Sequence, residues 1–122
     1  MKYFFFFIII STANISYSEL LKPQADLLPE EVISIQLTAL QNNNHPYKNA
    51  GIEQTWEFAH PNNKAMTGPL EKFKQMIYSR SYKILLEHEN NEITILNETN
   101  NRSVYKVYIL SKEKKSIIIY GK

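Results

Sequence analysis

The chain has 122 residues, enough for one domain with a single hydrophobic core. Its formal net charge is only +2 at pH 7, so the composition does not show the strong positive charge that is typical of nucleic-acid-binding proteins. The absence of cysteine excludes disulfides, thiolate metal sites, a nucleophilic thiol and a lipidated N-terminal cysteine. The hydrophobic core alone must therefore hold the domain together.

Residues 1–18 have the pattern of an export signal. Lys2 is followed by the uninterrupted apolar run Tyr3–Ile10, and small residues precede a cut after Ser18. The apolar run is far shorter than the ~20 residues that span a bilayer, which favours export over a stable membrane span. The sequence thus predicts a periplasmic or secreted protein. The alternatives are a cut after Ala13 and a buried N-terminal strand in place of the signal.

Cleavage after Ser18 leaves a single domain, 19–122, that opens with a helix. Pro29 and the two glutamates after it suit the first turn, because proline lacks the N–H that a helix start leaves unpaired and carboxylates favour the positive dipole end. The helix is expected to run to about Gln41. Its apolar stripe consists of Ile33, Leu37 and Leu40.

Two further helices are predicted around a stiff elbow. The second helix is expected over Ile52–Ala59, and Pro61 disfavours the helical region at the residue before it, so the chain should turn there. The third helix opens at Thr67-Gly68-Pro69, where threonine or glycine can act as N-cap. Its apolar stripe consists of Leu70, Phe73, Met76 and Ile77.

From Ser81 onward the apolar period changes to two, which is typical of strands. Asn90-Asn91 is expected to form a two-residue hairpin turn. Three helices followed by about four antiparallel strands predict an α+β fold, with the helices packed on one face of a meander sheet. The four expected strands are Tyr82–Glu87, Ile93–Asn97, Val104–Ser111 and Ser116–Tyr120.

The region around the elbow resembles one known family. The likeness covers about Leu28–Leu86 and is weak in the strands. The residues that carry it are Gly51-Ile52, Phe58-Ala59-His60-Pro61-Asn62-Asn63, Thr67-Gly68-Pro69-Leu70, Phe73, Met76 and Tyr82. At these positions the chain is similar to the domain-of-unknown-function family 4864, which occurs in bacteria and in plant plastids.

The resemblance implies a cystatin-like cone similar to nuclear transport factor 2, in which a curved sheet wraps around the first helix and an apolar pocket lies between helices and sheet. It implies no particular activity, because this architecture serves enzymes, ligand binders and interaction modules alike. Two features depart from the family pattern. The family often has serine where His60 stands, and this chain stops soon after Tyr120, which indicates a sheet truncated at its C-terminal end.

His60 is the candidate catalytic residue. If the second helix reaches it, Trp56 lies one turn back on the same face and Glu57 three residues back, so a carboxylate could poise the imidazole to move protons near neutral pH. A histidine at such a place more often ends a helix, where the negative dipole end favours it and a carbonyl accepts its hydrogen bond. We favour this structural role and keep an isomerase or dehydratase-like enzyme as the alternative.

Aromatic residues near the elbow are the candidate ligand contacts. Such a cluster could line a pocket for a hydrophobic ligand, or it could simply form the core of a domain this size. Asn63 could hold the polar end of a ligand, although asparagine after proline more often caps backbone groups in a turn. The predicted ligand-binding set is Trp56, His60, Asn63, Phe73, Tyr78 and Tyr82.

The sequence shows no pattern for a metal or a cofactor. Its three histidines are scattered, Asp26 is its one aspartate, and it has no nucleophile elbow or Ser/His/Asp arrangement. We therefore expect an exported, non-enzymatic domain without a cofactor that binds a small apolar ligand or a partner protein. A homodimer through the edge of the sheet is a further expectation.

Overall fold

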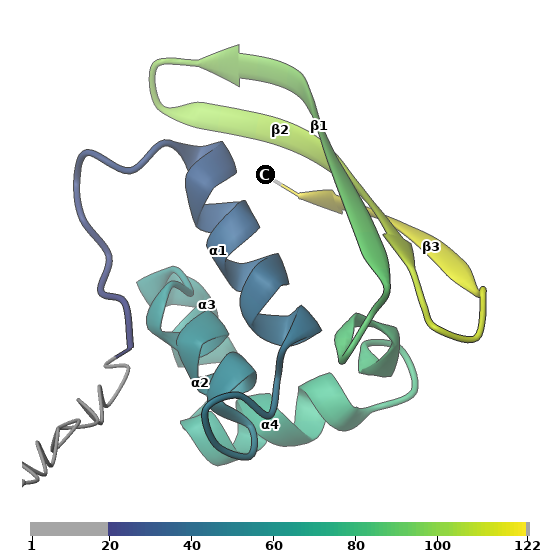
Figure 1. Ribbon diagram of the computed structural model, residues 1–122. Helices are drawn as coiled ribbons and strands as arrows, with labels where there is room; N and C mark the ends of the chain where they lie inside the picture. The colour runs from purple at the N-terminus through teal and green to yellow at the C-terminus, as the bar shows by residue number, and fades with distance from the viewer. Residues whose placement is uncertain (1–19, 122) are drawn as a thin grey trace, which may run out of the picture.

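The helices occupy the first half of the chain and the strands the second half, so the fold is α+β as predicted (Figure 1). The computed structural model describes residues 20–121. Within this range the elements are α1 (Pro29–Gln41), α2 (Ala50–Glu57), α3 (Pro61–Thr67), α4 (Leu70–Tyr78), the 3₁₀ turn η1 (Lys83–Leu85), β1 (Asn90–Thr99), β2 (Arg102–Leu110) and β3 (Ser116–Gly121). The prediction of residues 1–18 as a signal lies outside the described part of the chain.

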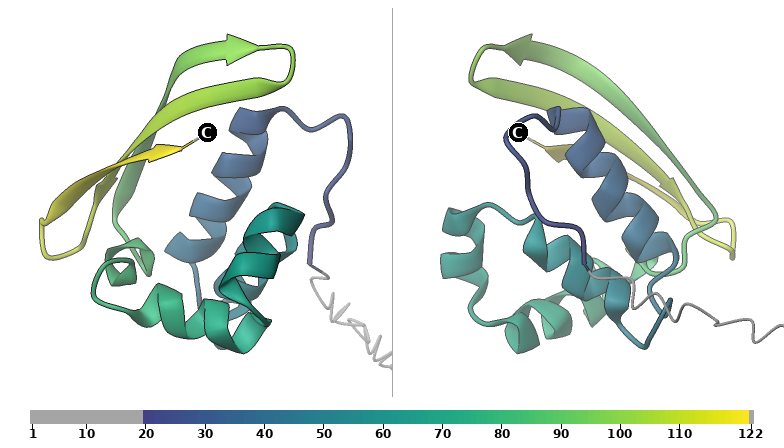
Figure 2. Two further views of the ribbon diagram at one scale, coloured as in Figure 1. Left: turned by 180° about the vertical axis from the view of Figure 1, so that it is seen from behind. Right: turned by 60° about the vertical axis from the view of Figure 1, so that its left-hand side comes forward.

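Helix α1 forms where the sequence predicts it and for the expected reasons. Pro29 occupies the first turn, and the Glu31 carboxylate accepts a hydrogen bond from the Leu28 N–H at 3.1 Å. The predicted stripe, spaced at three and four residues, is the buried face of the helix. Figures 1 and 2 show α1 in the middle of the molecule, with the sheet on one side and the other helices on the other.

Helix α2 begins two residues before the predicted start and packs closely on α1. Asn43, only 2% exposed, organises this start: its Oδ1 accepts the Ile52 N–H at 3.0 Å and its backbone carbonyl accepts the Gly51 N–H at 2.9 Å. A Cβ at Gly51 would lie 2.0 Å from the Ala39 carbonyl oxygen, so only glycine permits this approach of the two helices.

The chain leaves the helical region just before Pro61 as predicted, but a separate short helix, α3, begins at Pro61 and was not expected. His60 is extended and acts as N-cap, and Pro61 takes the first helical position, where its missing N–H costs nothing. Helix α3 ends at Gly68, whose φ of 76° lies in a region that side chains disfavour. The predicted third helix thus appears as α4, and the described residues contain four α-helices instead of three.

The prediction of a strand over Tyr82–Glu87 is wrong. Local hydrogen bonds fold this segment into turns and η1, because the Tyr82 and Lys83 N–H groups both donate to the Ser79 carbonyl, at 3.1 and 2.9 Å. Leu85 points into the core, whereas the alternation in the sequence predicted that Ile84 and Leu86 face one side. A short apolar run does not by itself distinguish a strand from a buried turn.

The described sheet therefore has three antiparallel strands in the order β1-β2-β3 instead of four. Asn90 and Asn91 begin β1 and do not form a hairpin turn, because no strand precedes them. The pairing of β1 with β2 slips between Ile95 and Asn97, where Leu96 is the extra residue of a bulge. The sheet bends over α1 (Figure 1). The shared core is Ile33, Leu37, Leu40, Ile52, Phe73, Ile77, Leu85, Val107 and Ile109.

Candidate functional site

An apolar groove of about 1210 Å³ lies among α1, the α3–α4 region and the inner face of the sheet. Helix α1 forms one wall through its buried stripe. Helix α4 contributes Phe73, Met76 and Ile77, and the sheet contributes Tyr105, Val107 and Ile119. Because side chains alternate between the faces of a strand, Ser103, Tyr105 and Val107 of β2 share the face that lines the groove. The groove and the hydrophobic core thus share their side chains.

Two polar side chains of the groove lining, Gln36 and Thr55, donate hydrogen bonds to backbone carbonyls. The Gln36 Nε2 donates to the Thr55 carbonyl at 3.2 Å, and the Thr55 hydroxyl donates to the Gly51 carbonyl at 2.8 Å. The Thr55 hydroxyl also lies 3.4 Å from the Gln36 carbonyl, so the hydrogen bonds of these two groove residues join α1 to α2. The groove therefore offers a ligand a mainly apolar surface here.

The structure brings together four of the six predicted ligand contacts. His60, Asn63, Phe73 and Tyr82 all line the groove. Phe73 is buried, whereas the other three are exposed at the rim. The predicted set therefore supplies one buried apolar contact, Phe73, and three exposed residues with polar groups at the rim.

The other two predicted contacts lie outside the groove lining. Trp56 packs on Phe73 with ring centroids 5.2 Å apart, and the Lys64 Nζ lies 5.5 Å from the indole ring. Tyr78 is 42% exposed, and its hydroxyl donates to the Asn49 side-chain oxygen. Trp56 thus packs on the groove residue Phe73 without lining the groove itself, and the Tyr78 hydrogen bond links α4 to the start of α2.

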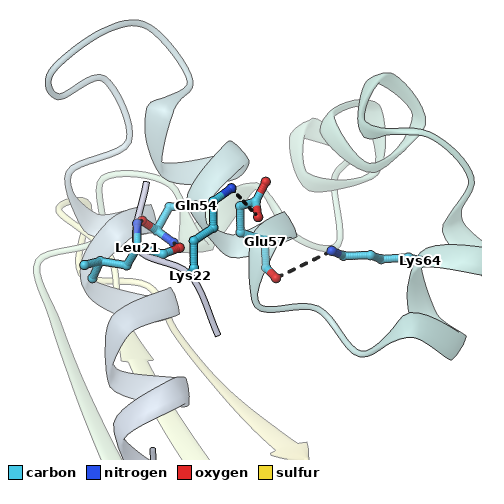
Figure 3. Close-up of polar contacts among 5 residues, drawn as sticks. All are labelled: Leu21, Lys22, Gln54, Glu57 and Lys64. Atoms are coloured by element: carbon cyan, nitrogen blue, oxygen red, sulfur yellow. Dashed lines mark hydrogen bonds and ion pairs between the residues drawn. The ribbon is translucent and has the colours of Figure 1, made fainter. Parts of the chain in front are cut away.

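His60 is a capping residue, at the opposite helix end from the one expected. Its Nδ1 accepts the Asn62 N–H at 3.1 Å at the N-terminus of α3. The predicted carboxylate partner is engaged elsewhere, because the Glu57 Oε2 contacts the Lys22 Nζ at 3.0 Å (Figure 3). The Glu57 carbonyl accepts a 3.5 Å hydrogen bond from the Lys64 Nζ. The pairing of His60 with Glu57 that proton transfer would require is not formed.

Sequence reasoning missed the contribution of the segment before α1. The Gln54 side chain forms two hydrogen bonds with the Leu21 backbone (Figure 3). The Leu21 N–H donates to Oε1 at 2.7 Å, and Nε2 donates to the Leu21 carbonyl at 3.0 Å. These two hydrogen bonds hold the segment that leads to Leu27 and Leu28, which line the groove. The sequence holds no local signal for a side-chain contact 33 residues apart.

The tip of the β1–β2 hairpin, 98–103, and Tyr105 were also missed. The period of two could have identified Tyr105, since it lies on the same strand face as the buried Ser103 and Val107. Burial raises the pKa of the Tyr105 phenol above its usual value of about 10. Its hydroxyl is therefore neutral at pH 7, so Tyr105 adds no charge to the groove lining, in which the hairpin tip contributes Glu98 and Arg102.

Two further titratable groups lie outside the groove lining. Desolvation, and then the hydrogen bond and charge of Glu53, raise the pKa of Tyr47, whose hydroxyl donates to the Glu53 Oε2 at 2.8 Å. His88 is 1% exposed; its Nδ1 lies 2.7 Å from the Leu85 carbonyl and its Nε2 lies 2.8 Å from the Asn91 amide nitrogen. With Nδ1 as donor and Nε2 as acceptor, both ring nitrogens have partners, which is a structural role.

Within residues 20–121 no cluster of three or more His, Asp or Glu side chains has the arrangement of a metal site. Over the same range no helix has the length and apolarity needed to span a membrane. Comparison with known proteins finds no match to a family model, to a curated protein or to a solved structure. The groove's own geometry is thus the basis for a functional hypothesis.

Proposed function

We propose that this protein is an exported, non-enzymatic domain that holds a small apolar ligand in the groove between α1, α4 and the sheet. The observation that carries the proposal is the groove of about 1210 Å³, whose walls on α1, α4 and the sheet are mainly apolar and whose polar residues include Glu98, Asn100 and Arg102 of the β1–β2 hairpin tip. Ligand pockets commonly measure about 300–1,000 Å³ and are lined mainly by apolar and aromatic side chains, with a few polar groups that set orientation. His60, Asn63 and Tyr82 at the rim provide such groups.

The geometry of His60 favours binding over catalysis. Its Nδ1 already accepts a backbone hydrogen bond, and the nearest candidate carboxylate in the sequence, Glu57, contacts a lysine. A general base needs a free nitrogen that faces the substrate and a group that orients it. We therefore assign His60 to the rim of a binding groove and not to a proton-transfer step.

The finer architecture belongs to the same proposal. We infer that the bent sheet and α1 represent a cystatin-like cone, and that the chain is related to the domain-of-unknown-function family 4864. The support is the position of α1 beneath a sheet that bends over it (Figure 1), together with the motifs at Phe58–Asn63 and Thr67–Leu70. Family membership remains a prediction.

Export rests on the sequence of residues 1–18. A basic residue, a short apolar run and small residues before Glu19 are the pattern that signal peptidase recognises. N-terminal sequencing of the protein collected outside the cytoplasm should therefore begin at Glu19. A sequence that begins at Met1 in the exported protein would contradict the predicted cut, and a start after Ala13 would move it to the second site.

Filling the groove tests the binding proposal. Ala59 lines the groove, so Ala59→Trp should occupy it and weaken binding of the neutral fluorescent probe N-phenyl-1-naphthylamine by about tenfold or more. The matched control is Ala65→Trp, because Ala65 is exposed on α3 and does not line the groove. Fluorescence titration of the exported protein measures both affinities.

Three outcomes would contradict the binding proposal. The first is that the parent protein does not bind the probe. The second is that Ala59→Trp binds it as tightly as the parent does. The third is that Ala65→Trp weakens binding to the same extent, because the probe would then occupy the surface of α3. Circular dichroism of both variants controls for loss of the fold.

A further inference from the structure

The free edge of β3 lacks the features that usually keep a second strand from pairing with a sheet, whereas the free edge of β1 has them. The order β1-β2-β3 leaves both outer strands with one unpaired side within residues 20–121. Strand β3 reads Ser-Ile-Ile-Ile-Tyr-Gly and contains no charged residue and no proline. Native proteins usually guard such edges with charges, proline or bulges, because a row of free backbone groups invites another strand.

The edge of β1 carries those protections. Glu92 and Glu98 lie on the strand, and the register slip at Leu96 interrupts its regular hydrogen-bonding edge. Leu96 is 50% exposed, close to the 53% of Ile118 at the centre of β3. The two edges thus expose similar apolar side chains but differ in regularity and in charge.

The ladder geometry shows which backbone groups of β3 are free. The Ser111 N–H donates to the Lys115 carbonyl at 2.8 Å, so the alternation of an antiparallel ladder directs the backbone groups of Ile117 and Ile119 toward β2. The backbone N–H and C=O groups of Ser116, Ile118 and Tyr120 therefore point away from the sheet. These six groups are spaced to pair with an antiparallel strand.

We propose that β3 pairs with β3 of a second copy of this chain around a two-fold axis at Ile118, which makes a continuous six-stranded sheet. In this register Ile118 lies opposite itself on the outer face, and Ile117 lies opposite Ile119 of the partner subunit on the inner face. Both faces of the junction are then apolar, and the interface is self-complementary, as a two-fold dimer requires. No charge among residues 116–121 opposes a like charge.

The length of the edge sets the strength of the dimer. Six residues at ~3.4 Å each give an edge of ~20 Å, and pairing it covers on the order of 400 Å² per copy. Stable dimers bury about 800 Å² per partner. We therefore expect a reversible dimer that forms as the protein concentration rises. The inference does not rest on the ligand proposal, because the free backbone groups lie in the plane of the sheet at its edge, although the Ile119 side chain on the inner face also lines the groove.

Sedimentation velocity over a hundredfold range of concentration tests this interface on the exported protein. The parent should pass from monomer to dimer. Ile118→Lys places two ammonium groups opposite each other at the axis and should raise the dissociation constant by about tenfold or more. The matched control Leu96→Lys adds the same charge at the other edge and should leave the constant within about twofold of the parent value.

Tyr120→Lys provides a second test of the same edge, because Tyr120 is 69% exposed and its loss leaves the monomer core intact. It should also weaken the dimer, even if Ile118→Lys fails to fold. The proposal is overturned if the parent stays monomeric throughout. It is also overturned if both β3 variants dimerise like the parent, or if Leu96→Lys is as damaging as they are.

Discussion

Phe73→Ala should lower the free energy of unfolding by about 3–5 kcal/mol. Phe73 is 7% exposed in the middle of α4, and its ring packs on Trp56 of α2. Removing it leaves a cavity at the junction of α2, α4 and the groove, and the loss of contacts adds to the lost hydrophobic burial. Urea denaturation followed by Trp56 fluorescence gives the value directly, since Trp56 is the one tryptophan of the chain.

Met66→Ala is the control for this change. Met66 is 86% exposed on α3, so its truncation should change stability by less than about 0.5 kcal/mol. If Phe73→Ala costs less than about 1 kcal/mol, α4 does not pack on the core as described. The groove would then lose the wall that α4 supplies.

Gly51→Ala should destabilise the protein by about 3 kcal/mol, although alanine is the better helix former by about 1 kcal/mol. The added Cβ would lie 2.0 Å from the Ala39 carbonyl oxygen and 2.7 Å from the Asn43 Cα. Both obstacles are backbone atoms, so no rotamer change relieves the clash and α1 must move away from α2. That movement also strains the hydrogen bond from the Ile52 N–H to Asn43.

The sign of the Gly51→Ala effect is diagnostic, because helix propensity alone predicts stabilisation. The control is Glu53→Ala on the same helix, where the carboxylate makes only an exposed hydrogen bond to Tyr47. It should cost less than about 1 kcal/mol. Thermal and urea denaturation of both variants provide the comparison. A stabilised Gly51→Ala protein would contradict the close packing of α1 on α2.

Long, strongly periodic segments of this sequence predicted their structure well. The stripe Ile33, Leu37 and Leu40 identifies both the helix and its buried face, since apolar residues recur on one side over about two turns. The strands β2 and β3 follow from alternation in the same way. Periodicity works here because each element buries one continuous side.

Short segments failed because tertiary contacts decide their conformation. The run Tyr82–Glu87 alternates like a strand, yet the Glu87 N–H donates to the Leu40 carbonyl at 3.0 Å and anchors a turn against the end of α1. The break before Pro61 was predicted, but the helix that starts there was not, although proline is well suited to a first helical turn. Local residue preferences permit both outcomes in each case.

The candidate site was predictable only in part. Phe73 follows from the stripe of its helix, and His60 and Asn63 reach the groove because they flank the start of α3. Trp56 packs on the Phe73 ring and does not line the groove. This contact depends on how α2 and α4 cross, which the spacing of residues in the sequence does not reveal. The approach of the hairpin tip to the groove is likewise a long-range result of how the sheet bends.

The most direct test of the ligand-binding proposal is a map of backbone amide shifts when the exported protein is titrated with N-phenyl-1-naphthylamine. The account predicts that the largest shifts fall on groove residues such as Ile33, Phe73 and Val107. The amides of Glu113 and Lys114, in the β2–β3 turn and outside the groove lining, should stay unchanged. Shifts confined to residues outside the groove lining, or no saturable shifts at all, would contradict a ligand site between the helices and the sheet.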